Sequence, residues 1–215
     1  MGLPVLIIGE SGSGKSTSMR NLLPTDALVF NVASKPFPFR NKNGLKKADN
    51  VDYDLIKSVI KSGKTLSYVI DDANLLMSFE LFKRVKEAGY GKFTDIACDY
   101  EGLLRFIINE TSPDTIVYLL QHSETLDSGK IKAKTVGKML DNQLTVESLF
   151  SIVLLAGTDG SSYWFETQSD GFTTCKSPME MFDSAKIDND LKMVDTVIRE
   201  YYELKPQPKA KGENK

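Results

Sequence analysis

A phosphate-binding sequence stands near the amino terminus of the chain. Residues 9–16 read Gly-Glu-Ser-Gly-Ser-Gly-Lys-Ser, a complete G-x-x-x-x-G-K-S motif that follows an apolar run. Glycines at these positions let the backbone turn so that successive N–H groups point at phosphate oxygens. The lysine is placed to reach the β- and γ-phosphates, and the final hydroxyl to ligate Mg²⁺. The motif therefore predicts a site for ATP and Mg²⁺.

We expect nucleotide contacts from the whole loop and from the residue after it. Lys15 is expected to act in binding and in catalysis, Ser16 to hold the metal, and Thr17 to contact the α-phosphate. A helix starting near Lys15 would add the positive end of its dipole. The expected nucleotide-binding residues are Gly9, Glu10, Ser11, Gly12, Ser13, Gly14, Lys15, Ser16 and Thr17.

Two carboxylates follow a second apolar run. The segment from Leu66 to Ile70 ends in Asp71 and Asp72. In P-loop proteins an Asp at this place holds the nucleotide's Mg²⁺, so we expect Asp71 to be a metal ligand. Asp72 is a candidate catalytic residue that would polarise the attacking water. The alternative is a solvated Asp pair that caps the next helix.

A third apolar run ends in polar groups at Gln121 and His122. We expect Gln121 to hydrogen-bond the γ-phosphate and to report its loss to the following loop, and the alternative is an exposed amide at a strand end. His122 is the only histidine, so a multi-histidine metal site is excluded, and we expect a hydrogen-bonded structural role for it.

Two segments are basic. The first interleaves cations with aromatic rings: Lys35, Phe37, Phe39, Arg40, Lys42, Lys46 and Lys47. The second follows the Gln121 strand and carries Lys130, Lys132, Lys134 and Lys138. Single-strand binding uses cations for phosphates and rings for bases, so both segments are candidate DNA-binding segments. Ordinary solvated lysines are the alternative for both.

The elements that must position these residues alternate along the chain. Uninterrupted apolar runs, which are typical of parallel strands buried on both faces, predict strands over Leu3–Ile8, Ala27–Val32, Leu66–Ile70, Ile116–Leu120 and Ile152–Ala156. Helical spacing of apolar residues predicts helices over Lys15–Leu23, Asp54–Lys61, Asp99–Asn109 and Ile187–Leu204. The pattern predicts an α/β fold with a mostly parallel five-stranded sheet flanked by helices.

The carboxyl-terminal part departs from this alternation. Turn residues over 157–162 precede a strand-like Tyr163-Trp164-Phe165, which predicts an antiparallel hairpin at a sheet edge. A closing helix would complete one domain over residues 1–204. Residues 205–215 are rich in Pro, Lys and Gly, so we expect a disordered tail.

Composition excludes several classes. The 215 residues are 41% hydrophobic, which suits one domain with a substantial core, and a net charge of −2 predicts no global attraction to nucleic acid. Two cysteines make neither a disulfide scaffold nor a zinc site. No apolar stretch approaches the roughly 20 residues that span a bilayer. We expect a cytoplasmic protein without membrane contact.

The order of these motifs resembles the RecA-like branch of P-loop ATPases. More specifically, the chain is similar to phage-encoded ATP-binding proteins of the AAA/RecA-like type, including the Sak-type single-strand annealing recombinases. The motifs that carry the resemblance are Gly9–Ser16, Val69-Ile70-Asp71-Asp72, Gly91-Lys92-Phe93, Leu120-Gln121-His122-Ser123-Glu124, Val136-Gly137-Lys138 and Thr174-Cys175-Lys176-Ser177-Pro178-Met179.

The resemblance implies that the Gln121 strand lies between the P-loop strand and the Asp71 strand. It also implies assembly into homo-oligomeric rings or filaments, a DNA-facing segment after Gln121, and residence in the host cytoplasm. The chain departs from RecA-type enzymes at the end of the second strand, where it has no catalytic Glu. Either Asp72 or Glu124 replaces that group, or hydrolysis is slow.

The resulting hypothesis is an ATPase of phage DNA recombination or replication that binds single-stranded DNA. The small acidic excess agrees with weak DNA affinity and with a single-strand-binding protein as a helper. Two alternatives stay open, a small-molecule P-loop kinase and a non-hydrolysing, nucleotide-regulated assembly factor. The sparseness of arginine weighs against the kinase.

Overall fold

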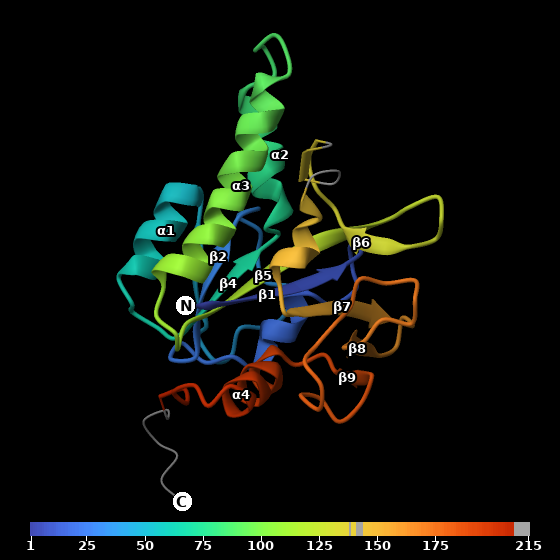
Figure 1. Cartoon of the computed structure of the whole chain (residues 1–215). Coiled ribbons are helices and arrows are strands. Elements are labelled where there is room, and N and C mark those ends of the chain that lie inside the picture. The colour runs from blue at the N-terminus through green and yellow to red at the C-terminus, as the bar shows by residue number, and fades with distance from the viewer. Residues whose placement is uncertain (138, 141–143, 209–215) are drawn as a thin grey trace, which may run out of the picture.

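Parallel strands form the centre of the molecule (Figure 1). A computed structural model describes residues 1–137, 139–140 and 144–208. The strands run in the order β3-β2-β4-β5-β1-β7-β8-β9, and β6 pairs with β5. The parallel strands are β1 (Leu3–Gly9), β2 (Ala27–Asn31), β3 (Lys46–Asp49), β4 (Ser67–Asp71), β5 (Ile116–Thr125) and β7 (Ile152–Thr158).

The position of β5 was expected from the resemblance, and the pairing confirms it. Strand β5 lies between β1 and β4, so the P-loop strand and the Asp71 strand are not neighbours. Ile8 pairs with Gln121, and Gly9 with His122. The carboxyl ends of β1, β4 and β5 therefore meet at one edge of the sheet, where their loops can form a common site.

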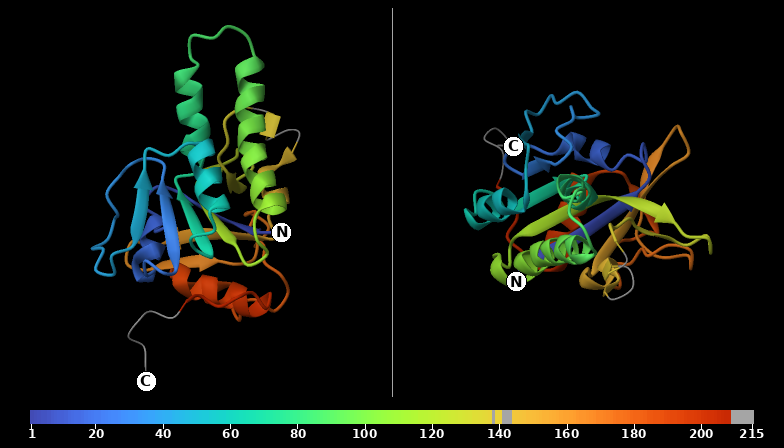
Figure 2. Two further views of the ribbon diagram at one scale, coloured as in Figure 1. Left: turned by 90° about the vertical axis from the view of Figure 1, so that its left-hand side faces the viewer. Right: turned by 90° about the horizontal axis from the view of Figure 1, so that it is seen from above.

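Helices cover both faces of the sheet. Helices α1 (Tyr53–Lys61), α2 (Asn74–Lys83) and α3 (Gly91–Glu110) pack on one face, and α4 (Leu191–Tyr201) lies on the other (Figure 1). Figure 2 shows α2 and α3 rising together well beyond the sheet. Apolar side chains fill both interfaces, so each central strand is buried on both sides, as its uninterrupted apolar sequence predicts.

The sheet is wider than the five strands we expected. The described residues form nine strands, which include β6 (Ile131–Ala133), β8 (Tyr163–Glu166) and β9 (Lys186–Asp188). Strand β3 was not predicted, because its sequence Lys46-Lys47-Ala48-Asp49 is polar. Polar strands are tolerated at a sheet edge, and β3 is the outermost strand on its side.

The helix after the P-loop is shorter than predicted. In place of a helix over Lys15–Leu23, the chain forms a 3₁₀ helix, η1 (Ser16–Asn21), whose buried residues are Ser18 and Met19. Six residues of 3₁₀ structure carry a smaller aligned dipole than the α-helix we expected. Helix α2 was missed, and α3 begins eight residues before the predicted start at Asp99.

The carboxyl-terminal elements agree in kind with the prediction. Strands β7 and β8 form the expected antiparallel hairpin, and β9 extends it. A second 3₁₀ helix, η3 (Val146–Leu149), precedes β7. The first residues of the predicted tail contact the domain: Lys205 is bound to Asp114, and Gln207 donates to Ser67 and Asp195. Residues 209–215 lie outside the described part of the chain.

The search for membrane-spanning segments covered the described residues. None of their helices combines the length and the apolar character that crossing a bilayer requires.

Candidate functional site

A pocket opens over the P-loop at the carboxyl edge of the sheet. Its volume is about 320 Å³. The P-loop, the segment after β2, the ends of β4 and β5, and the β8 strand all contribute to it. The lining residues are Ser11, Gly12, Gly14, Lys15, Ser16, Thr17, Lys35, Pro38, Asp72, His122 and Tyr163.

Two glycines of the loop have a backbone that disfavours other residues. Gly12 has φ +82° and Gly14 has φ +90°, in the left-handed region. A Cβ at Gly14 would also lie 2.6 Å from Cδ1 of Tyr163, so the ring of β8 packs directly on the loop. The N–H groups of Gly12, Gly14 and Lys15 donate no hydrogen bond within the described residues. The turn thus offers free donors of the kind that hold phosphate oxygens.

Lys15 is folded back onto its own loop. Its Nζ donates to the carbonyl oxygens of Gly9 (2.7 Å) and Glu10 (2.8 Å). The side chain is buried, and burial lowers the pKa of Lys15 to about 8, although Asp72 and Asp71 oppose the shift. The ammonium group is therefore held beside the pocket by carbonyl oxygens, which phosphate oxygens would replace.

Ser16 and Asp71 lie side by side although 55 residues separate them. The Ser16 Oγ donates to Asp71 Oδ1 at 2.7 Å. Burial raises the pKa of Asp71 to about 6, and the Ser16 hydrogen bond partly offsets this shift. These are the hydroxyl and the carboxylate that the sequence assigned to Mg²⁺, and the fold brings them into contact.

This donor set fits a metal that is completed by a nucleotide. Among the described residues, no group of three or more His, Cys, Asp or Glu side chains is arranged to hold a metal. Mg²⁺ commonly takes one or two protein oxygens and completes its shell with phosphate oxygens and water. The pair formed by Ser16 and Asp71 matches that pattern.

Asp72 makes two contacts at the pocket wall. Its Oδ2 lies 2.7 Å from Nζ of Lys35, and its Oδ1 lies 3.4 Å from Nε2 of His122. Burial raises the pKa of Asp72, but the hydrogen bonds from His122 and Lys35 outweigh it and lower the pKa to about 2. Asp72 also has φ +61°. A carboxylate this acidic is a weak base, so Asp72 is poorly suited to abstract a proton from water by itself.

Gln121 lies on the opposite face of β5 from the pocket. The side chain is fully buried, accepts from the Tyr100 hydroxyl at 2.5 Å and donates to the Lys134 carbonyl at 2.6 Å. Neither the phosphate contact nor the exposed amide that we considered matches this placement. Adjacent strand residues point to opposite faces, so His122 takes the position at the pocket that we expected of Gln121.

Glu124 also lies away from the P-loop. It belongs to the antiparallel pairing of β5 with β6, and its Oε1 lies 3.0 Å from Nζ of Lys132. It is absent from the residues that line the pocket. Its expected catalytic role therefore has no support in the geometry, and His122 is the titratable group that the sequence analysis undervalued.

The first basic segment divides between two places. Lys35 lines the P-loop pocket. Phe37 and Phe39 stack on each other with ring centroids 4.9 Å apart and pack against the core, while Lys47 lies over the Phe37 ring. This packing contradicts our expectation that the two rings stand free for bases. The exposed cations that remain are Arg40, Lys42 and Lys46.

The second basic segment forms the hairpin of β5 and β6. Lys130 and Lys134 are exposed, and Lys132 is engaged with Glu124. Lys138 lies outside the described residues. The hairpin is a DNA-binding candidate only through its exposed lysines.

The arginines of the chain are mostly committed elsewhere. Arg84 pairs with Glu87 and Asp95, and Arg199 forms a buried pair with Asp195. Arg20 and Arg105 are bound to Asn189 and Glu101. Arg40 is exposed on the loop after β2. None of the described residues that line the P-loop pocket is an arginine.

The chain was compared with models of known protein families and with curated proteins, and neither comparison gave a match. The account of the site therefore rests on the motif and on the geometry around it.

Proposed function

We propose that this protein binds ATP with Mg²⁺ in the P-loop pocket. The observation that carries the proposal is the 2.7 Å hydrogen bond from Ser16 to Asp71, because it joins the loop hydroxyl to the carboxylate expected of such a site. The unpaired N–H groups at Gly12, Gly14 and Lys15 support it. Ser16 and Asp71 would hold the metal, and Lys15 would leave the loop carbonyls to pair with phosphate oxygens.

We infer that hydrolysis is slow unless an effector assists it. Bound Mg²⁺ would stabilise the negative charge that develops on the phosphates. Among the described residues, Asp72 is the carboxylate that lines the pocket, and it is paired with Lys35. The nearby Asp71 accepts the Ser16 hydroxyl. His122 carries an imidazole that can accept and donate a proton at the pocket, and Asp72 is placed to orient it.

We propose a role in phage DNA recombination or replication, with single-stranded DNA as the effector. The position of β5 between β1 and β4 supports a RecA-like P-loop ATPase, as the resemblance implies. The exposed Arg40, Lys42, Lys46, Lys130 and Lys134 are the candidate phosphate contacts. A homo-oligomer, a single-strand-binding helper protein and residence in the host cytoplasm belong to the same proposal.

ATP turnover with and without single-stranded DNA at low salt tests the proposal. Wild type should hydrolyse ATP, DNA should raise the rate, and Lys15→Ala should abolish it. Lys64→Ala removes an exposed lysine remote from the pocket and should behave as wild type. Turnover that persists in Lys15→Ala would remove the P-loop from the account.

A second candidate is a nucleotide-regulated assembly factor that does not hydrolyse ATP. The pairing of Asp72 with Lys35 favours it, because this pairing leaves the site without a free carboxylate base. Tight ATP binding and ATP-dependent oligomerisation, with no turnover in the presence of DNA, would support this candidate.

A further inference from the structure

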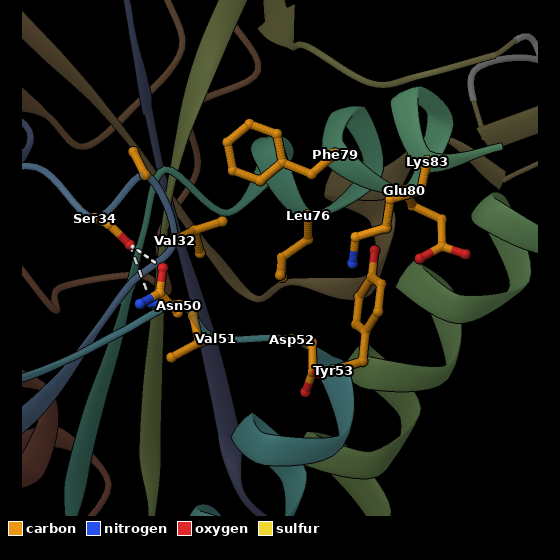
Figure 3. A pocket seen from close by; sticks show the side chains of 11 residues that line it. Val32, Ser34, Asn50, Val51, Asp52, Tyr53, Leu76, Phe79, Glu80 and Lys83 are labelled. Carbon is orange, nitrogen blue, oxygen red and sulfur yellow. Dashed lines mark hydrogen bonds between the residues drawn. The ribbon is translucent and has the colours of Figure 1, made fainter. Parts of the chain in front are cut away.

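A second pocket lies beside the P-loop pocket at the same edge of the sheet. Its volume is about 450 Å³. Residues that follow β2 and β3 form one side, and helix α2 forms the other (Figure 3). The lining residues are Val32, Ala33, Ser34, Asn50, Val51, Asp52, Tyr53, Leu76, Phe79, Glu80 and Lys83. None of these residues lines the P-loop pocket.

An aromatic ring and aliphatic side chains dominate part of this lining. Phe79 is 42% exposed, so its ring is accessible from the pocket. Leu76, Val32 and Val51 are buried and form the apolar floor next to it. Such a surface favours a flat apolar face that can stack on the Phe79 ring.

The charges at this pocket disfavour a phosphate inside it. Asp52 and Glu80 are acidic and Lys83 is basic, so the titratable carboxylates outnumber the ammonium group. The Asp52 carboxylate accepts the N–H of Leu55 and caps α1. A neutral ligand with hydrogen-bonding edges matches this lining better than an anion does.

Hydrogen-bonding groups stand at both ends of the pocket. At one end the Ser34 hydroxyl donates to Asn50 Oδ1 (3.2 Å) and accepts from Asn50 N (3.0 Å). At the other, the hydroxyl oxygen of Tyr53 is buried and has no partner within the described residues. A buried hydroxyl without a partner lowers stability, and a polar ligand edge would supply the missing hydrogen bond once the side chains around it shift to admit the ligand.

A short turn joins this pocket to the P-loop pocket. Ser34 lines the one and Lys35 the other, and Lys35 reaches Asp72. Asn31 fixes the turn, because its side chain donates to the Lys35 carbonyl (2.7 Å) and accepts the Lys35 N–H (3.3 Å). Ser34 has φ +53°, a conformation that costs free energy for a residue other than glycine. The two pockets are therefore adjacent, with neighbouring residues of one fixed turn lining each.

We infer that the pocket between α1 and α2 binds a nucleobase, which stacks on Phe79 and presents its polar edge to Tyr53 or to the Ser34 and Asn50 pair. The inference rests on the proposed function for its preferred source, a base of single-stranded DNA. A free nucleoside has the same chemistry and is the other source. The base is distinct from that of the bound ATP.

Binding of two oligonucleotides of equal length tests the inference. One is oligothymidylate, and the other carries abasic sites and so keeps the phosphates without the bases. Stacking on an aromatic side chain typically changes affinity by about fivefold or more. Wild type should prefer oligothymidylate by that factor, and Phe79→Ala should lose the preference. Phe82→Ala is the matched control, because Phe82 is on the same helix, is 73% exposed and does not line the pocket.

Tyr53→Phe separates a ligand contact from a structural role. Removing an unpartnered buried hydroxyl should leave the unfolding temperature unchanged or raise it. If the hydroxyl contacts the base, the same variant should bind oligothymidylate more weakly by a few fold. A variant that is more stable and binds DNA as wild type does would remove Tyr53 from the inference.

Titrations with thymidine and deoxyadenosine distinguish the sources. Nucleoside binding that Phe79→Ala abolishes, with equal affinity for the two oligonucleotides, would support the pocket and assign it to a free nucleoside. Preference for oligothymidylate that persists in Phe79→Ala would overturn the inference. The inference would also be overturned if Phe79→Ala weakened ATP binding as much as it weakened binding of oligothymidylate, because the pocket would then belong to the ATP site.

The outcomes separate this inference from the proposed function. Base binding that depends on Phe79, in a protein that neither binds nor hydrolyses ATP, would keep the pocket and reject the ATPase. ATP turnover lost in Lys15→Ala, with no binding of DNA or nucleoside, would keep the ATP site and reject the pocket.

Discussion

The Nζ of Lys35 lies 2.7 Å from the Asp72 carboxylate, at the wall of the P-loop pocket. The contact places Lys35 at the P-loop pocket, although its sequence neighbours suggested DNA binding. It places an exposed cation at the P-loop pocket of a protein whose arginines are mostly engaged elsewhere. The Lys35 side chain is 62% exposed, so it can leave Asp72 for a phosphate without unpacking the core.

Substitution of Lys35 should therefore weaken nucleotide binding more than DNA binding. We expect Lys35→Ala to weaken Mg-ATP binding by about threefold or more, the scale of one charge-assisted hydrogen bond. The slope of DNA affinity against salt should stay unchanged in this variant. Lys42→Ala, an exposed lysine of the same segment, should leave ATP binding intact and reduce that slope by about 1. The opposite pattern in the two variants would return Lys35 to the DNA-binding set.

The buried Asp71 carboxylate should lower the free energy of unfolding, although the proposed Mg²⁺ site requires this carboxylate. Its folded-state pKa of about 6 lies above the ordinary value of 3.8, so ionisation penalises the folded state as pH rises from about 4 to 6. Asp71→Asn should raise the free energy of unfolding by about 1–3 kcal/mol at pH 7.5 without Mg²⁺. The difference in the free energy of unfolding between wild type and Asp71→Asn should vanish near pH 3.5, where residue 71 is neutral in both proteins. Thermal unfolding across this pH range measures it, and an equal or less stable variant at pH 7.5 would contradict the buried charge.

Substitution of Gly14 should lower stability more than substitution of Gly160, a glycine with the same φ angle. Gly14 and Gly160 both have φ +90°, but only at Gly14 does a Cβ meet the ring of Tyr163. Gly160→Ala thus measures the conformational cost alone, on the order of 1 kcal/mol. We expect Gly14→Ala to lose more stability than this and to bind ATP poorly. Equal unfolding temperatures for the two variants would show that Tyr163 does not pack on the loop.

Substitution of His122 should impair ATP turnover, whereas substitution of the adjacent Gln121 should lower stability. His122→Asn should lower the rate of ATP turnover by about 10²-fold with little change in ATP affinity, as for loss of a group that acts in proton transfer. Gln121→Leu leaves the buried Tyr100 hydroxyl without its acceptor and should lower the free energy of unfolding by about 1–3 kcal/mol. Kinetics and denaturant unfolding of both variants check this. A Gln121 variant of normal stability with impaired turnover would restore it as the phosphate sensor.

The rate at which a reagent labels each of the two cysteines tests the fold without any ligand. Cys98 is exposed on α3, whereas Cys175 is buried and burial raises its pKa to about 11. At pH 8 a thiol reagent should label Cys98 rapidly and Cys175 only after unfolding, because the thiolate is the reactive form. Cys98→Ser should abolish the rapid phase, and fast labelling that remains would mean that Cys175 is accessible.

The sequence predicted the parts of this fold whose physical signals are local. The glycines of the P-loop and the apolar run before Asp71 each specify their own geometry, and both lie where we expected. The sequence did not indicate which face of the sheet each side chain of β5 takes, because residues on both faces of this strand are apolar up to Leu120. One residue decides which face a side chain takes, so the pocket received His122 in place of Gln121.

Other features depend on partners that are distant in sequence. Strand β3 is polar and forms because β2 offers it an unpaired edge. Helix α2 was missed since two of its large apolar residues, Phe79 and Phe82, are exposed and break the apolar stripe. Phe37 and Phe39 resemble base-stacking residues in the sequence, but the fold packs them against each other.

The Mg²⁺ dependence of ATP binding tests the central claim most directly. ATP affinity would be measured by calorimetry with Mg²⁺ and with a chelator, for wild type and for Asp71→Asn. We predict that Mg²⁺ strengthens binding to wild type by at least about tenfold, and that this gain is lost in Asp71→Asn while metal-free binding is kept. An equal gain in both proteins would contradict the assignment of Ser16 and Asp71 as the metal site.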